Sequence, residues 1–97
     1  MRMMLKVGIP TEAGNKGIKD GSLPKLIEST MQALNAEAAY FIAQEGRRCA
    51  LFFFDMRDSS EIPGIAEPLF SGFNAEIELV PAMNGDDLRR GLAAITQ

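Results

Sequence analysis

The stretch RCALFFFDM, residues 48–56, decides how this chain folds. Residues 51–54, LFFF, follow one another without alternation, so a strand built from them carries apolar side chains on both faces. Such a strand belongs inside a sheet, because at an exposed edge it would pair with other chains and aggregate. The sequence therefore predicts a central strand that is covered on both faces.

Three further strands are expected around this stretch. Residues 3–9 and 75–81 alternate between apolar and polar positions, and residues 38–43 are rich in strand formers. The short link QEGR, residues 44–47, joins the last of these to the central strand, and Gly46 indicates a hairpin.

Helical segments are expected in the longer connections. Residues 23–34 place apolar side chains at helical spacing, and a segment weakened by internal glycines, residues 11–20, precedes them. Thr11 and Ser22 are residue types that cap helices, so we expect them to begin these two segments.

Two more helices are expected toward the end of the chain. One begins near Glu61 after the capping residue types at 58–60, and Pro68 should kink or split it. Asn84 should cap the last helix, since acidic residues follow in its first turn.

The order of elements predicts an α+β fold. A βαββαβ chain with a terminal helix gives a four-stranded antiparallel sheet in the order 4-1-3-2, with helices on one face, which is the ferredoxin-like fold. The 97 residues form a single domain, residues 1–97, with no element left to cover the second sheet face. We therefore expect a homodimer in which two sheets meet.

The chain also resembles the dimeric α+β barrel superfamily. The segments that carry the resemblance are IPTEAGNKGIKDGSLPK, EAAYF, FFFDMRDSSEIPGIAEPLF and PAMNGDDL, which are similar to a group of small uncharacterised bacterial proteins of that type. The resemblance implies the fold and the dimer. The superfamily contains isomerases, monooxygenases, haem-degrading enzymes and ligand-binding domains, so the resemblance transfers no catalytic residue.

The amino-acid composition limits the classes of partner that we expect this chain to bind. With 10 basic and 13 acidic residues the net charge is −3, which argues against nucleic-acid binding. No apolar run approaches the length of a membrane span. A single cysteine and the absence of a signal-peptide pattern favour a cytoplasmic protein.

Missing residue types exclude several chemistries. The sequence has no histidine, so imidazole catalysis and histidine-ligated haem or metal cannot occur. Cys49 is alone and cannot build a zinc cage, and Asp86 and Asp87 suit a helix start better than a metal site. We expect no metal and no cofactor.

Charged residues are candidates on the sheet face away from the helices. Lys6 lies in the middle of the first strand, and Glu76 and Glu78 lie on the strand expected beside it. A cross-strand ion pair that sets the register is the structural interpretation, and a proton-transfer pair is the functional one.

The remaining candidates come from other elements. Tyr40 is either a core or interface residue or a substrate contact, and Asp55 is either a charge that protects the strand end or an acid. Lys16 and Lys19 lie in GNKGIKDGS, residues 14–22, which lacks the order of glycine, lysine and serine of a phosphate loop. Residues 11–21 could instead form a mobile flap over a cleft, where the lysines meet an acidic ligand.

Three functions remain open at this level. The first is a homodimeric domain that binds a small molecule in a cleft between sheet and helices. The second is a cofactor-independent isomerase or monooxygenase acting on a small apolar or aromatic substrate. The third is a pure dimerisation module.

Overall fold

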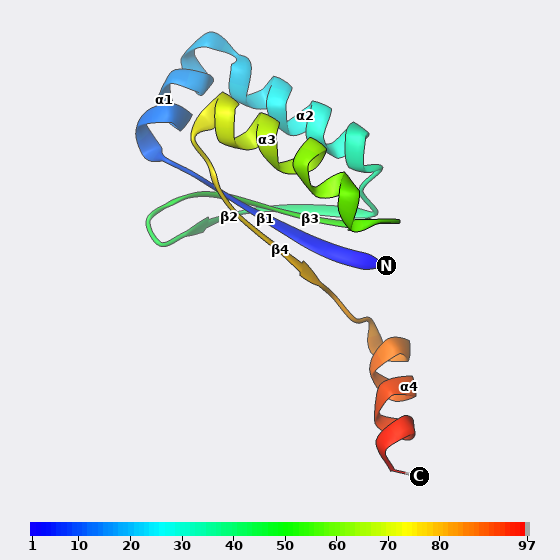
Figure 1. Cartoon of the computed structure of the whole chain (residues 1–97). Coiled ribbons are helices and arrows are strands. Elements are labelled where there is room, and N and C mark those ends of the chain that lie inside the picture. The colour runs from blue at the N-terminus through cyan, green and yellow to red at the C-terminus, as the bar shows by residue number, and fades with distance from the viewer. Residues whose placement is uncertain (97) are drawn as a thin grey trace.

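The computed structural model describes residues 1–96. Four strands and four α-helices follow one another along the chain (Figure 1), with one short 3-10 turn at Ser59–Glu61. In chain order they are β1 (Arg2–Ile9), α1 (Thr11–Asp20), α2 (Ser22–Leu34), β2 (Ala38–Gln44), β3 (Arg47–Asp55), α3 (Ile62–Phe73), β4 (Glu76–Pro81) and α4 (Gly85–Ile95).

The strands form one antiparallel sheet in the order β2-β3-β1-β4. This is the predicted order read from the opposite edge. The first connection holds two helices, α1 and α2, so the chain is more than a simple βαββαβ unit. The architecture is α+β with four antiparallel strands and is compatible with a ferredoxin-like fold.

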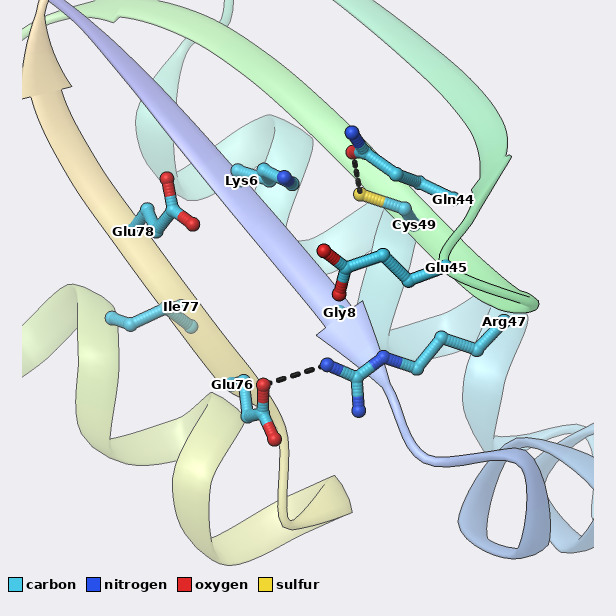
Figure 2. Close-up of a pocket in the computed structure, with 9 residues that line it drawn as sticks. All are labelled: Lys6, Gly8, Gln44, Glu45, Arg47, Cys49, Glu76, Ile77 and Glu78. Atoms are coloured by element: carbon cyan, nitrogen blue, oxygen red, sulfur yellow. Dashed lines mark hydrogen bonds and ion pairs between the residues drawn. The ribbon is translucent and has the colours of Figure 1, made fainter.

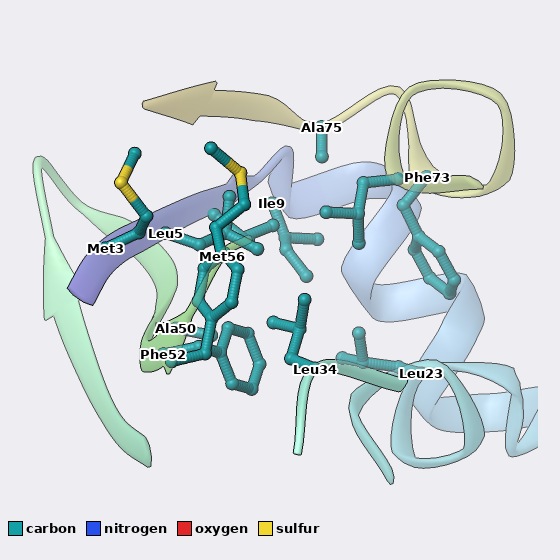
Figure 3. Close-up of a cluster of buried hydrophobic side chains, with 13 residues drawn as sticks. Met3, Leu5, Ile9, Leu23, Leu34, Ala50, Phe52, Met56, Phe73 and Ala75 are labelled. Carbon is teal, nitrogen blue, oxygen red and sulfur yellow. The ribbon is translucent and has the colours of Figure 1, made fainter. Parts of the chain in front are cut away.

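Helices α1, α2 and α3 lie together on one face of the sheet (Figure 1). Alternate residues of β1 point into this side, and Leu5 is fully buried between Phe52 on β3 and Leu79 on β4. Figure 3 shows the resulting core, in which strand residues meet Leu23, Leu34 and Phe73 from the helices and their ends.

The central position of β3 is confirmed, but its two faces differ. Ala50, Phe52 and Phe54 are buried beneath the helices. Leu51 and Phe53 point to the opposite side, which we call the open face, and they are only half-buried. Within the described residues no element packs over this face, so a single chain leaves the second face of β3 uncovered.

Both predicted caps of the first two helices were wrong. Thr11 is itself the first residue of α1 and makes no capping hydrogen bond. The helix α2 follows Gly21, which has a φ of 80°, and Ser22 donates from its amide and hydroxyl to the Asp20 carboxylate. The side-chain hydrogen bond from Ser22 lowers the pKa of Asp20, and Ser22 is the first residue of α2 rather than its cap.

The later helices follow the predictions more closely. Asn84 accepts the amide of Asp87 and caps α4 as predicted, whereas Asp58 accepts the amide of Ser60 and caps the 3-10 turn. Helix α3 follows Glu61 without a side-chain cap. Pro68, however, does not split α3, which is one continuous helix. The carbonyl that Pro68 leaves without a helical partner belongs to Gly64, which is exposed and therefore open to water.

Helix α4 stands apart from the rest of the chain. It lies on the other side of the sheet from α1, α2 and α3 (Figure 1), and Leu88, Leu92 and Ile95 on one of its faces are exposed. The radius of gyration is 15.4 Å, whereas a compact chain of this length would have about 12.5 Å. An ion pair of 2.8 Å between Arg2 and Asp87 holds the start of α4 to β1. None of the described helices has the length and apolarity needed to cross a membrane.

The glycines of α1 allow it to pack closely, a role that the sequence did not reveal. A Cβ on Gly17 would lie 2.5 Å from the Phe73 ring and 2.9 Å from the Cβ of Leu23. Both neighbours are buried and cannot move aside easily. Gly14 and Gly17, both from the stretch GNKGIKDGS, are the two buried residues of α1.

We predict that Gly17→Ala lowers the free energy of unfolding by about 1–3 kcal/mol, because the added methyl group overpacks this contact. Gly64→Ala is the matched control, since nothing lies within 4 Å of its Cβ position. It should stabilise the protein by about 0.4–1 kcal/mol through the unfolded chain. Urea unfolding of both variants tests this, and equal effects of the two substitutions would contradict it.

Candidate functional site

The structure has a polar pocket on the open face (Figure 2). Its volume is about 120 Å³, and it lies where β1, β3 and β4 run side by side near the β2–β3 turn. The residues that line it are Lys6, Gly8, Gln44, Glu45, Arg47, Cys49, Glu76, Ile77 and Glu78.

An ion pair closes one side of this polar pocket. The Arg47 side chain from β3 crosses β1 at Gly8, and its Nη2 lies 2.6 Å from Oε2 of Glu76 on β4 (Figure 2). A Cβ on Gly8 would touch the guanidinium at 3.4 Å, so the glycine leaves that path open. The hydrogen bond with Arg47 lowers the pKa of Glu76, and the same bond raises the pKa of Arg47.

Lys6 and Glu78 share the polar pocket. The register places them directly opposite each other on β1 and β4, which the sequence predicted to be neighbours. Among the ion pairs of the described residues, none joins the two side chains within 4 Å. Their adjacency is confirmed, and the cross-strand ion pair is not formed here.

The other predicted candidates lie elsewhere. Tyr40 is on the open face, where its ring packs edge-on against Phe53 at 6.4 Å. Asp55 is at the far end of β3 and accepts a hydrogen bond from the Met1 amino group, which lowers its pKa. Lys16 and Lys19 are exposed on α1 and line none of the hollows described here. Of the candidate residues predicted from the sequence, only Lys6, Glu76 and Glu78 therefore line the same pocket.

A larger apolar groove lies on the helix side of the sheet. It has a volume of about 650 Å³ and runs between α1 and α2 above and β2 and β3 below. Its apolar lining includes Ile18, Leu23, Ile27 and Phe41, and the same residues line an adjoining hollow that extends to Met31. Ile18 and Phe41 are 56% and 53% exposed, although both are large apolar side chains.

Arg48 lies at one end of this apolar groove. Its guanidinium packs against α1, where a Cβ on Gly14 would lie 2.5 Å from Nη1, and Nη2 donates to the Asn15 side-chain oxygen at 3.1 Å. The only other charged residue of the lining is Arg47, whose guanidinium is paired with Glu76. No acidic residue lines the groove.

The sequence predicted a cleft between sheet and helices but not the residues that line the groove, because these come from separate elements. Ile18 is in the polar helix α1, Phe41 is on an edge strand, and Arg48 precedes the apolar run of β3. The available signal was the alternation of β2, which places Phe41 on the helix side opposite Ala50.

Neither a metal site in the described part of the chain nor a known relative identifies the function of these pockets. Within residues 1–96, no group of histidine, cysteine or carboxylate side chains is arranged to hold a metal ion. No family model, curated protein or solved structure matches the chain.

The ion pair of the polar pocket predicts a pH effect. Because the pKa of Glu76 is below its ordinary value of 4.5, the pair stabilises the fold above that pH, and this stabilisation is lost as the pH falls through the lowered pKa. In Arg47→Gln the pKa of Glu76 should return toward 4.5. An NMR titration of the carboxyl carbon measures this, with Arg48→Gln as the control that should leave the Glu76 pKa unchanged. Equal pKa values in wild type and Arg47→Gln would contradict the prediction.

Proposed function

We propose that this chain is a homodimeric domain that binds a small apolar molecule in the apolar groove between its helices and its sheet. The observation that carries the proposal is the groove itself, a hollow of about 650 Å³ with exposed apolar walls. Ligand sites are commonly concave, mainly apolar and in the range of about 300–1,000 Å³. The polar atoms that would fix an orientation lie at one end, on Thr11 and Arg48.

The open face supports the proposed dimer. Apolar side chains gather there from all four strands, and folded monomers rarely leave so large a contiguous patch in water. We call this set the open-face patch: Met4, Tyr40, Ile42, Leu51, Phe53 and Val80. A second sheet packed at about 10 Å would cover both central strands.

Helix α4 supports the same arrangement. It lies on the open-face side of the sheet (Figure 1), so a second copy placed there would also meet Leu88, Leu92 and Ile95. An isolated helix of 11 residues is marginal in water, and packing of its apolar side against a partner would stabilise it. With this dimer, the fold is the ferredoxin-like fold of the dimeric α+β barrel kind.

A second candidate function is catalysis in the polar pocket. Lys6 and Glu78 lie together on the face that the second copy would cover, and burial of both groups would prepare them for proton transfer. This would make the protein a cofactor-independent isomerase or monooxygenase. The larger apolar groove favours binding as the primary role.

We predict that Tyr40→Glu converts the dimer to a monomer at micromolar concentration. The substitution places a charge within the open-face patch, where Tyr40 is 59% exposed in the single chain and can be replaced without disturbing the core. Phe70→Glu is the matched control, since Phe70 is an exposed aromatic residue of α3. Light scattering of the chromatographed proteins measures the mass. A wild-type monomer would overturn the proposed dimer.

We also predict that 1-octanol binds in the apolar groove. In NMR titrations, the amide signals of Leu23, Ile27 and Phe41 should shift with a saturable dependence on 1-octanol. Ile18→Glu should remove these shifts, because it places a charge in the apolar lining. Ile62→Glu, an exposed isoleucine outside the groove, should retain them. A dimer that shows no saturable shifts would leave dimerisation as the whole function.

A further inference from the structure

We propose that the natural ligand of the apolar groove is an apolar monocarboxylic acid whose carboxylate is bound by Arg48. The inference rests on the proposed function, that the groove binds a small apolar molecule. It adds the chemical class of the ligand and the residue that selects it.

The first support is the charge of the groove. Arg47 and Arg48 are its only charged lining residues, and the Arg47 guanidinium is neutralised by Glu76. The Arg48 guanidinium meets only the neutral amide oxygen of Asn15. Arg2, Arg89 and Arg90 each pair with a carboxylate, and of the two arginines without an ion pair in the described part of the chain, Arg57 lies outside the groove and Arg48 lines it. The groove thus carries one uncompensated positive charge, which a carboxylate would balance.

The second support is the surroundings of Arg48. Its guanidinium lies beside Gly14 and Asn15 of α1, one turn after the helix begins at Thr11. Thr11 lines the same end of the groove, and its hydroxyl caps nothing. Glu12, the acid of the first turn of α1, is exposed and does not line the groove. A guanidinium can hold a carboxylate through two parallel hydrogen bonds, and the threonine hydroxyl can donate a third.

The third support is the apolar lining of the groove away from Arg48. From Arg48 the groove continues past Ile18, Leu23 and Ile27 into the hollow that ends at Met31. These apolar side chains offer no hydrogen-bonding groups. Among the described residues that line the adjoining hollow, the only charged one is the exposed Glu28, which would repel a carboxylate placed there. A ligand that fits both parts therefore has one anionic end and an apolar body, such as an alkyl chain or a ring.

Three probes with the same alkyl chain test the inference: octanoate, 1-octanol and octylammonium. NMR titration of the full-length wild-type protein gives a Kd for each probe. Octanoate should bind at least tenfold more tightly than 1-octanol, which corresponds to about 1.4 kcal/mol. Octylammonium should bind most weakly, because its charge is repelled by Arg48.

Two variants assign the effect to the proposed residue. Arg48→Met keeps the apolar stem and should weaken octanoate about tenfold while leaving 1-octanol unchanged, which is the loss expected for one charge-assisted hydrogen-bond pair. Arg57→Met removes the same charge from a residue outside the groove and should change neither Kd. These results together support the inference.

Other outcomes overturn it, and they distinguish it from the proposed function. Equal Kd values for octanoate and 1-octanol, unchanged in Arg48→Met, would refute the acid while the groove remained a binding site. Failure of all three probes would refute the groove and the inference together. Octanoate binding in Leu92→Asp but not in the wild type would show that α4 of a second copy fills the groove, which would also overturn the proposal.

Discussion

The rest of the structure depends on one constraint, that β3 carries apolar side chains on both faces. Phe52 and its neighbours on one face need the helices, so α1, α2 and α3 all lie on that side (Figure 1). The hydrophobic effect that fixes this layer acts equally on Leu51 and Phe53, which the same chain leaves half-buried. Strand β3 pairs with β2 on one side and with β1 on the other, so it cannot lie at the edge of the sheet without losing one of these pairings. The apolar side chains on the open face therefore favour contact with a partner.

The apolar groove has a related origin, because the helix layer is narrower than the sheet. Helices α1 and α2 both contact β3, whereas β2 forms the edge of the sheet and stays largely exposed. The buried Gly14 and Gly17 let α1 pack closely against Arg48 and Phe73. On the helix side of β2, Ala39 packs against the core, but Phe41 and Ala43 remain exposed. The hollow beside Phe41 follows from this mismatch in width.

Sequence reasoning reached the sheet because strand patterns are local and the pairing rules are few. The apolar run of β3 indicated a central strand, and alternation placed Lys6 and Glu78 on the same face of neighbouring strands, whereas the structure shows that they lie directly opposite each other. The packing of α1 does not follow from the sequence, because helix propensity counts Gly17 as destabilising, whereas in the fold its missing side chain makes room for Phe73. A cleft between sheet and helices was predicted, but not its lining, because residues such as Ile18, Phe41 and Arg48 are separated in sequence and come together only in the folded chain. Pro68 failed as a helix breaker because the carbonyl that it frees is accessible to water.

The neighbouring residues Arg47 and Arg48 show why position decides the role of a charge. The β2–β3 turn passes through Glu45 and Gly46, both with positive φ, and the strand that follows sends successive side chains to opposite faces. Arg47 therefore reaches Glu76 on the open face, and Arg48 reaches α1 at the apolar groove. The sheet itself separates the two guanidinium groups, so Glu76 cannot lie against Arg48. Two identical residues, adjacent in sequence, thus contribute an ion pair beside the expected dimer contact and a free positive charge at the groove.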